Sequence, residues 1–456
     1  MEIKECVEKQ RIFYNTNITK NIEYRIRALK KLKEVIIKNE DKINQALRLD
    51  LNKSAFESYM CETGMVLNEL TYTIKNIKKW SKIKKVKTPI SQYHSKSFIM
   101  PESYGVTLII APWNYPFMLS MQPLISSIAA GNCAIVKPSE YSCNTSKVIK
   151  DIISETFEEE YVTVVEGGVT ETQELLNERF DYIFYTGGTE VGKIIMEKAA
   201  KNLTPVTLEL GGKSPCIVDE TANVELAAKR IMFGKILNAG QTCVAPDYIL
   251  VQNKMKEELI KNIKKYIINF LEKDALNNTD YPRIINEKHF KRLQKLIENE
   301  DVILGGNFNK DILKIEPTIV DNVKLDSPIM KEEIFGPILP IISFEKIEEA
   351  IEIVKKNEKP LSLYLFTSNN KVERKILSEI SFGGGCINDT VIHLTSPNLC
   401  FGGVGASGMG EYHGKYGFDT FTHYKSILKK HNWIDLPMRY HKYTTKKLKI
   451  IKMFLK

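Results

Sequence analysis

The sequence has no secretion signal and no long apolar run. Residues 1–20 are polar and charged, without the apolar stretch of about 7–15 residues that a secretory signal requires. No segment approaches the roughly 20 consecutive apolar residues of a membrane-spanning helix. These absences predict a cytoplasmic protein. The composition, with 43% hydrophobic and 27% charged residues, is typical of a soluble globular chain.

Paired cysteine motifs are also missing. The eight cysteines include no Cys-x-x-Cys pair, so neither a zinc ribbon nor a dithiol redox motif is expected, and we expect no metal site. Cysteines spread in this way through a chain without a secretion signal predict reduced thiols.

Most of the chain lacks a charge excess. The net charge is +9, but residues 429–456 hold nine Lys or Arg and one acid, so this segment alone carries +8. The remaining body is close to neutral, which gives no reason to expect a nucleic-acid partner. At 456 residues the chain is long enough for more than one domain.

The hydrophobic pattern predicts an α/β protein. Residues 20–83 carry apolar residues at helical spacing, and residues 93–100 alternate as an extended ribbon would. Short β-rich runs then alternate with helical runs, which predicts a parallel, doubly wound sheet; these runs are 106–110, 133–137, 161–165, 182–185 and 206–210. A second α/β alternation follows residue 212, and it is followed by a glycine-rich stretch at 401–410 and a last predicted strand at 418–428.

Cys243 lies in the segment 240–246, Gly-Gln-Thr-Cys-Val-Ala-Pro, between a predicted helix and a predicted strand. Loops between packed elements commonly carry chemistry. A thiolate attacks a carbonyl carbon and later leaves from an acyl group, so Cys243 is a candidate nucleophile. Taken alone it could equally be a structural thiol. A papain-like cysteine–histidine pair is another alternative, but no histidine motif accompanies it.

Two further residues suit the same chemistry. Glu209 ends a predicted strand, the position at which open α/β sheets bind ligands. An uncharged environment would raise its pKa toward neutrality and let it act as a general base. Asn114 lies between two nearby prolines, and a fixed side-chain amide can stabilise an oxyanion. Taken alone, the first would be a solvated carboxylate and the second a turn residue.

A nucleotide site is predicted at two strand ends. Residues 185–192, Tyr-Thr-Gly-Gly-Thr-Glu-Val-Gly, follow a strand and open a helix, whose first N–H groups can bind a pyrophosphate, although the spacing differs from Gly-x-Gly-x-x-Gly. At the other strand end, Lys137 can donate to ribose hydroxyls. Glu140 can accept from the 2′-OH, which favours NAD over NADP.

The order and spacing of these motifs resemble the aldehyde dehydrogenase superfamily over most of the chain, from about residue 10 to residue 450. Two more segments match, 332–337 (Glu-Glu-Ile-Phe-Gly-Pro) and 401–410 (Phe-Gly-Gly-Val-Gly-Ala-Ser-Gly-Met-Gly). The continuation through 412–415 and 418–421 is similar to class 3 aldehyde dehydrogenases, the fatty and aromatic aldehyde branch. The resemblance implies NAD(P)-dependent oxidation of an aldehyde to a carboxylic acid.

The resemblance also implies a role for each candidate residue. Cys243 would attack the aldehyde to give a thiohemiacetal, Asn114 would hold its oxyanion, and Glu209 would activate the water that hydrolyses the thioester. The implied cofactor-binding residues are Lys137, Glu140, Gly187, Gly188, Gly192, Glu333 and Phe335. Class 3 members often accept NADP as well as NAD, so Glu140 need not exclude NADP.

The implied domain organisation has four parts. A Rossmann-type cofactor-binding domain would comprise residues 1–83 and 103–210, with 395–417 returning to it. A second α/β catalytic domain would span 211–394, a β-ribbon oligomerisation arm 84–102 and 418–430, and a basic tail 431–456. Class 3 members are typically dimers, so a homodimer is expected.

The implied substrate pocket is apolar, which favours medium- or long-chain aliphatic or aromatic aldehydes. Its candidate lining residues are Met60, Tyr115, Phe233 and Leu237. Two alternative functions are an acylating dehydrogenase that passes the acyl group to coenzyme A and a non-catalytic cofactor-binding relative. A base at Glu209 argues against the first, and the complete set of Cys243, Glu209 and Asn114 argues against the second.

The tail has an amphipathic pattern at residues 446–456. On a helix, Leu448, Ile451 and Leu455 share one face, and Lys449, Lys452 and Lys456 form an adjacent basic face. Basic amphipathic helices can lie on anionic membrane surfaces, so peripheral membrane contact is one expectation. The alternative is a helix packed on a partner subunit.

Overall fold

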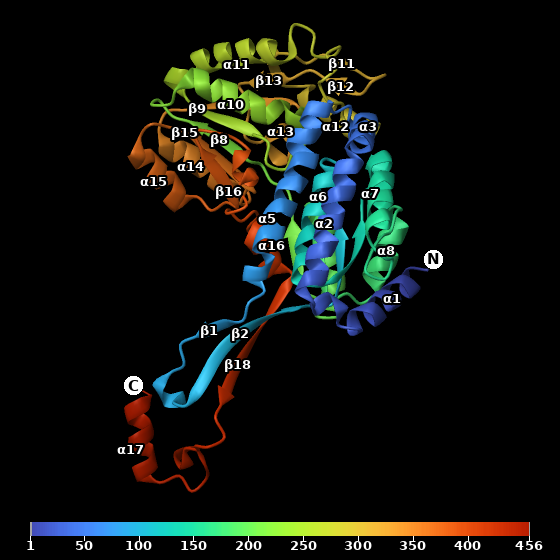
Figure 1. Ribbon diagram of the computed structural model, residues 1–456. Coiled ribbons are helices and arrows are strands. Elements are labelled where there is room, and N and C mark those ends of the chain that lie inside the picture. The colour runs from blue at the N-terminus through green and yellow to red at the C-terminus, as the bar shows by residue number, and fades with distance from the viewer. Residues whose placement is uncertain (1, 456) are drawn as a thin grey trace.

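The computed structural model describes residues 2–455 and has three main sheets (Figure 1), together with a short antiparallel pair of strands, β11 (Phe308–Asn309) and β12 (Lys314–Ile315). The first sheet has six strands in the order β17-β7-β6-β3-β4-β5 and is parallel except for β17. Its strands are β3 (Val106–Ile110), β4 (Cys133–Lys137), β5 (Val162–Val164), β6 (Tyr182–Thr186), β7 (Val206–Glu209) and β17 (Gly408–Met409). Strands β3, β4 and β6 are buried along their whole length, as expected of a parallel sheet covered on both faces.

Helices cover both faces of the first sheet. They are α1 (Ile3–Asn15), α2 (Ile22–Lys38), α3 (Glu40–Leu51), α5 (Gly64–Trp80), α6 (Pro116–Ala130), α7 (Cys143–Thr156), α8 (Val169–Asn177), α9 (Thr189–Ala200) and α16 (Gly414–Thr420). Every residue of α6 is buried, so this helix forms the centre of the core. Because α6 begins directly after the loop that holds Asn114, the core fixes one wall of the site described below.

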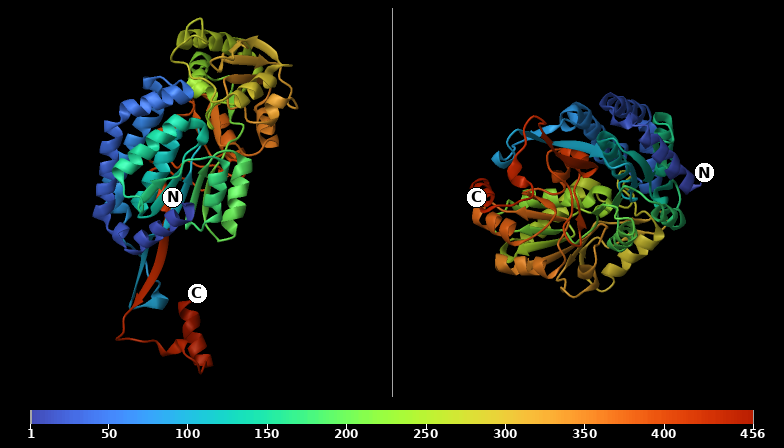
Figure 2. Two further views of the ribbon diagram at one scale, coloured as in Figure 1. Left: turned by 90° about the vertical axis from the view of Figure 1, so that its right-hand side faces the viewer. Right: turned by 90° about the horizontal axis from the view of Figure 1, so that it is seen from below.

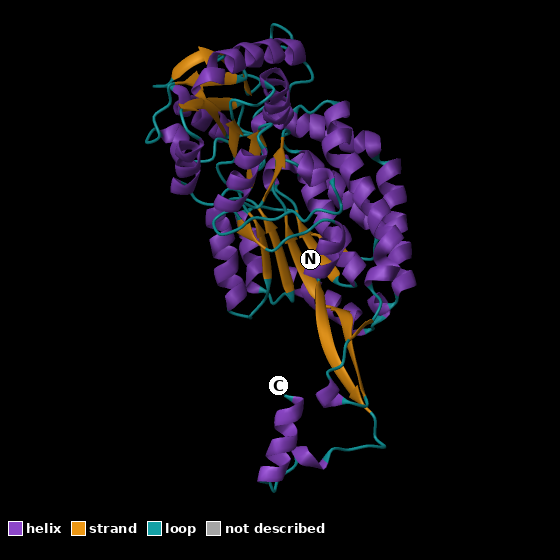
Figure 3. Cartoon of the chain, turned by 90° about the vertical axis from the view of Figure 1, so that its left-hand side faces the viewer, coloured by secondary structure: helices purple, strands orange, loops and turns teal. Residues whose placement is uncertain are grey.

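The second sheet has seven strands in the order β10-β13-β14-β9-β8-β15-β16. Its strands are β8 (Pro215–Val218), β9 (Tyr248–Gln252), β10 (Asp301–Leu304), β13 (Thr318–Asp321), β14 (Ile338–Phe344), β15 (Ser362–Phe366) and β16 (Gly384–Ile387). The main helices around it are α10 (Val224–Ile236), α11 (Lys256–Leu271), α12 (Glu287–Ile297), α14 (Ile347–Lys356) and α15 (Asn370–Glu379). Loops lie between the two sheets (Figure 3), and residues 210–214 join β7 directly to β8.

The third sheet is an arm that extends away from the body (Figures 1 and 2). It consists of β1 (Lys84–Val86), β2 (Ser95–Ser103) and β18 (Thr422–Lys430), all antiparallel. Beyond it lies α17 (Thr445–Phe454), which has no buried residue; Lys456 of the expected basic face lies outside the described residues. Within residues 2–455, no helix combines the length and the apolar content needed to cross a membrane.

The α/β class with parallel sheets is confirmed, but several elements differ from prediction. The last strand was expected at 418–428, whereas residues 414–420 form α16 and the strand begins at Thr422. The reason is packing: Phe418 is buried against Trp80, with ring centroids 5.7 Å apart, and Gly417 fits against Ser126 of α6. Helices α1 and α15 and strands β10, β13 and β16 were not anticipated.

Candidate active site

The turn that carries Cys243 is conformationally unusual. After α10, three consecutive residues have positive φ: Asn238 (51°), Ala239 (50°) and Gly240 (73°). The two residues with side chains pay a conformational cost there, which persists only where surrounding contacts hold it. Gly240 is required because a Cβ at this position would clash with the Gly336 carbonyl.

Hydrogen bonds hold this turn in place. Glu57 Oε1 accepts from the Asn238 N–H at 2.7 Å. Gln241 Oε1 accepts from the Ile285 N–H at 3.0 Å, while its Nε2 donates to the Arg283 carbonyl at 2.9 Å. The backbone just before Cys243 is therefore anchored to two other segments of the chain, as a precisely placed nucleophile requires.

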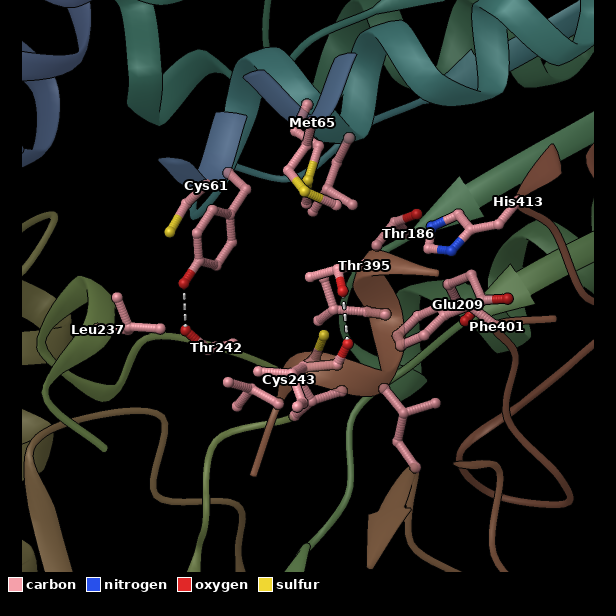
Figure 4. A pocket seen from close by; sticks show the side chains of 18 of the residues that line it. Cys61, Met65, Thr186, Glu209, Leu237, Thr242, Cys243, Thr395, Phe401 and His413 are labelled. Atoms are coloured by element: carbon pink, nitrogen blue, oxygen red, sulfur yellow. Dashed lines mark hydrogen bonds between the residues drawn. The ribbon is translucent and has the colours of Figure 1, made fainter. Parts of the chain in front are cut away.

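Cys243 lines two cavities, and Figure 4 shows it among the side chains of the apolar one. One is an apolar cavity of about 200 Å³, and the other, of about 520 Å³, opens along the first sheet. Five residues line both cavities: Leu119, Thr186, Glu209, Leu210 and Cys243. Of these, Cys243 and Glu209 are the titratable ones, so a molecule in either cavity can reach both groups.

Glu209 ends β7 and is almost completely buried. Neither of its carboxylate oxygens has a hydrogen-bond partner among the described residues. Burial, with a smaller contribution from Glu411, raises the pKa of Glu209 well above its usual value. A buried carboxyl group with no internal partner and a raised pKa is suited to exchange a proton with a bound molecule.

The surroundings of Cys243 favour the protonated thiol over the thiolate. Burial raises its pKa far above the ordinary value, and Glu333 and Glu209 add to the shift because their charges oppose a thiolate. The thiol must therefore lose its proton before the sulfur can bond to a carbonyl carbon.

Asn114 follows β3 and faces the Cys243 turn. Its Nδ2 donates to the Gln241 carbonyl at 3.1 Å, and the residue is 3% exposed. The side-chain amide is thus held by Gln241, two residues before Cys243 in the sequence, and Asn114 lines the larger cavity together with Cys243. Such a donor can stabilise an oxyanion formed next to Cys243.

The larger cavity suits a dinucleotide cofactor. Gly187 and Gly188 line it at the start of α9, and the space above Gly188 is open, so backbone N–H groups are accessible to a phosphate. Glu333 and Phe335 line its other side, and Phe335 contacts Trp113 edge-on with ring centroids 5.4 Å apart. Burial raises the pKa of Glu333 to about 8, with Asp247 contributing next.

Three predicted cofactor residues do not line this cavity. Lys137 and Glu140 follow the end of β4, with Lys137 Nζ 3.7 Å from Glu140 Oε2 and donating to the Pro138 carbonyl at 2.9 Å. Gly192 lies inside α9 and faces Leu210, so its small size serves the packing of the helix against the end of β7.

The smaller cavity contains all four residues predicted for the substrate: Met60, Tyr115, Phe233 and Leu237. The Tyr115 hydroxyl is hydrogen-bonded to Thr242 Oγ1 at 2.7 Å, which leaves its ring as an apolar wall. His413 also lines the cavity; burial lowers its pKa to about 3, so it is neutral near pH 7. The cavity therefore presents an apolar, largely uncharged surface to a ligand.

Several lining residues were not found from the sequence. They are Cys61, Met65, Met118, Val391, Ile392, Leu394, Thr395, Phe401, Tyr412 and His413. Those after residue 390 lie on the short 3-10 helix Ile392–Thr395 or outside the named helices and strands, so no extended helical or strand period shows which side chains turn inward. Met65 and Met118 occupy helices, where their apolar character indicated only burial.

Comparisons with known proteins agree with this geometry. Residues 2–427 match the aldehyde dehydrogenase family. The chain is 50% identical to the 4,4′-diaponeurosporen-aldehyde dehydrogenase of Staphylococcus aureus, covering 100% of this chain and 99% of that protein. It is 46% identical to the dimeric NADP-preferring aldehyde dehydrogenase of Rattus norvegicus, covering 94% of each chain.

A solved structure gives the same result. The substrate-bound state of Staphylococcus aureus AldH superposes with a TM-score of 0.98 at 49% identity, covering 100% of this chain and 99% of that one. The similarity extends over both sheets, the arm and the tail, because the whole chain is covered. The chain therefore belongs to the aldehyde dehydrogenase family and carries out NAD(P)-dependent aldehyde oxidation.

Proposed function

We propose that the enzyme oxidises medium- or long-chain aliphatic or aromatic aldehydes to carboxylic acids, with Cys243 as nucleophile, Glu209 as base and Asn114 as oxyanion donor. The observation that carries this assignment is the position of Cys243 and Glu209 on the shared wall of an apolar cavity and the larger cavity that Gly187 and Gly188 line. We assign cofactor binding to the first sheet with its helices and the main catalytic loop to the unit around the second sheet.

In the first half of the reaction, Cys243 Sγ bonds to the aldehyde carbon. Cys243 reacts as the thiolate after its proton has passed to solvent, and the carbonyl oxygen becomes an alkoxide that the Asn114 amide stabilises. When bound, the nicotinamide cofactor supplies the hydride acceptor, so the thiohemiacetal is oxidised to a thioester on Cys243.

In the second half, Glu209 takes a proton from water as the water oxygen bonds to the thioester carbon. The Asn114 amide again holds the oxyanion. The carbon–sulfur bond then breaks, the acid leaves, and the sulfur regains a proton from Glu209, which restores the carboxylate. One aldehyde, one water and one oxidised cofactor give one acid, one reduced cofactor and one proton.

Transfer of the acyl group to coenzyme A is the competing outcome. Glu209 supports hydrolysis because a buried base beside the thioester activates water directly. Product analysis with and without coenzyme A tests this assignment. Free acid should form at the same rate in both reactions, whereas acyl-coenzyme A as the main product would contradict hydrolysis.

Substrate chain length should determine the catalytic efficiency. The apolar lining predicts that kcat/KM rises as methylene groups are added to the aldehyde, by up to roughly four-fold per group at about 0.8 kcal/mol each, and then levels off when the cavity is filled. A series of linear aldehydes measured by cofactor reduction checks this. A flat profile from acetaldehyde upward would contradict an apolar substrate cavity.

We propose that NAD is favoured over NADP. Glu140, whose side chain is 39% exposed beside Lys137, would accept a hydrogen bond from a ribose 2′-OH and repel a 2′-phosphate. Glu140→Gln should therefore shift the ratio of kcat/KM values toward NADP by roughly two- to five-fold, since a partly exposed charge contributes up to about 1 kcal/mol. An unchanged ratio would remove Glu140 from cofactor selection.

We further propose a cytoplasmic homodimer formed through β1, β2 and β18, with α17 making peripheral contact with anionic membranes. The support is exposure: β18 is largely uncovered, and Met453 and Leu455 of the tail are 70% and 71% exposed. The basic residues beside them would attract an anionic surface by on the order of 1 kcal/mol each.

Truncation tests the tail. The full chain should co-sediment with phosphatidylserine-containing vesicles at low salt and be released as salt rises. A form ending at Thr445 should remain in solution, and neither form should bind neutral phosphatidylcholine vesicles. Equal behaviour of the two forms, combined with a weaker dimer in the truncated one, would instead assign α17 to packing between subunits.

A further inference from the structure

A buried ion pair contacts the backbone of Asn114. Lys53, between α3 and α4 (Ala55–Ser58), donates from Nζ to Glu62 Oε1 at 2.5 Å and to the Asn114 carbonyl at 2.9 Å. The Lys53 ammonium also lies 4.0 Å from the centroid of the Tyr115 ring. Both members of the pair have 0% exposed side chains, so this contact is fully shielded from solvent.

Glu62 connects the same pair to the start of α6. Its second oxygen accepts from the N–H groups of Phe117 at 2.8 Å and Met118 at 3.2 Å, which lie in the first turn of the helix and lack internal partners. A carboxylate here is also favoured by the helix dipole. Glu62 itself lies in a π-helix, Tyr59–Thr63, a distortion that often occurs at functional sites.

Hydrogen bonds therefore hold both the backbone carbonyl and the side-chain amide of Asn114. Its carbonyl accepts from Lys53 and from Asn238 Nδ2, the latter at 2.8 Å, and its own Nδ2 donates to the Gln241 carbonyl. Asn238 Nδ2 also donates to the Gln241 carbonyl at 3.0 Å, so the Asn114 loop and the Cys243 turn share one network. The neighbouring helix start is fixed by Glu62.

Stability alone gives a weak reason for this arrangement. Burying two charges costs several kcal/mol of desolvation for each ion, and well-packed apolar residues commonly serve as well. The charged pair instead makes specific hydrogen bonds that fix backbone positions. Lys53 fixes the Asn114 carbonyl oxygen, and Glu62 fixes the first N–H groups of α6. Both constraints act within four residues of Asn114.

We propose that Lys53 and Glu62 are positioning residues that set the Asn114 amide for oxyanion stabilisation. This inference rests on the proposed role of Asn114. The pair lies behind the loop and acts on the alkoxide through Asn114. It should accelerate formation of the thioester and leave cofactor affinity unchanged.

A double-mutant cycle tests the inference. Lys53→Met combined with Glu62→Gln removes both charges and keeps the side-chain lengths. With enzyme in excess over aldehyde and saturating NAD, single-turnover NADH formation should slow by at least about ten-fold in this variant and by about 10²–10³ in Asn114→Ala. Adding the pair substitutions to Asn114→Ala should slow it less than about two-fold further, because coupled residues are not additive.

The controls separate positioning from general damage. NADH affinity, measured by fluorescence, should stay within about two-fold of wild type in all these variants. Lys256→Met is the matched control, because it removes another ion pair, a half-buried one to Asp321 at 2.7 Å, that is far from Asn114 in the sequence. This variant should keep the wild-type single-turnover rate. If the double substitution does not fold, Glu62→Gln alone should slow the reaction, and again only when Asn114 is present.

Two results would overturn the inference. One is a wild-type single-turnover rate in the pair variants. The other is an equal fold-loss with and without Asn114, which would show that the pair acts independently. A wild-type rate in Asn114→Ala itself would instead reject the proposed role of Asn114, and the positioning role would fail with it.

Discussion

Replacing Cys243 with alanine is expected to abolish aldehyde oxidation, lowering kcat/KM by on the order of 10⁴ or more. Without Sγ no thiohemiacetal forms, and neither the Asn114 amide nor the Glu209 carboxyl group can substitute for the covalent bond. The measurement is NADH formation from a long-chain aldehyde at saturating NAD.

A matched substitution separates chemistry from folding. Cys143→Ala removes an exposed thiol at the start of α7 and should retain wild-type activity and thermal stability. NADH affinity of Cys243→Ala should also be close to wild type. Residual oxidation by Cys243→Ala within about ten-fold of wild type would assign the nucleophile to another group.

Glu209→Gln should separate the two halves of the reaction. Because the amide cannot take a proton from water, the thioester should accumulate after about one NADH has formed per chain, and steady turnover should fall by about 10²–10⁴. Stopped-flow absorbance of NADH, followed by the slow steady rate, measures both phases. Steady turnover at the wild-type rate would exclude Glu209 as the base.

The pH dependence of the wild-type enzyme follows from the same carboxyl group. Burial raises the pKa of Glu209, and only the ionised form can accept a proton. The rate of hydrolysis should therefore increase as pH rises through this elevated pKa. The rate should not level off at a pH near the ordinary pKa of a glutamate. Glu209→Gln should lose this rise in the hydrolysis rate.

The fold class could be predicted because the strands are continuous apolar runs between helical ones. Strands β3, β4 and β6 are fully buried, and a two-sided burial pattern of this kind is visible in the sequence. Residues 418–421 resisted prediction because β-prone aromatics there pack as a helix against α5 and α6. Tertiary packing overrode local propensity.

The candidate reactive residues could be selected because short motifs carry them, whereas the residues that hold them in place are distributed over the chain. The ion pair behind Asn114 joins residues 53, 62 and 114–118, which no local pattern connects. One signal was nonetheless present: Glu62 precedes Val66 and Leu70 at four-residue spacing, so an acid occupies the core-facing side of a helical segment. A charge at such a position indicates a buried partner.

The most direct test of the mechanism is the intact mass of Glu209→Gln after mixing with NAD and a long-chain aldehyde. The account predicts that each chain gains one acyl group, that peptide mapping locates it on Cys243, and that NADH forms in equal amount. NADH formation without a covalent acyl adduct, or an adduct on another residue such as Cys61, would contradict the assignment of Cys243 as the nucleophile and Glu209 as the hydrolytic base.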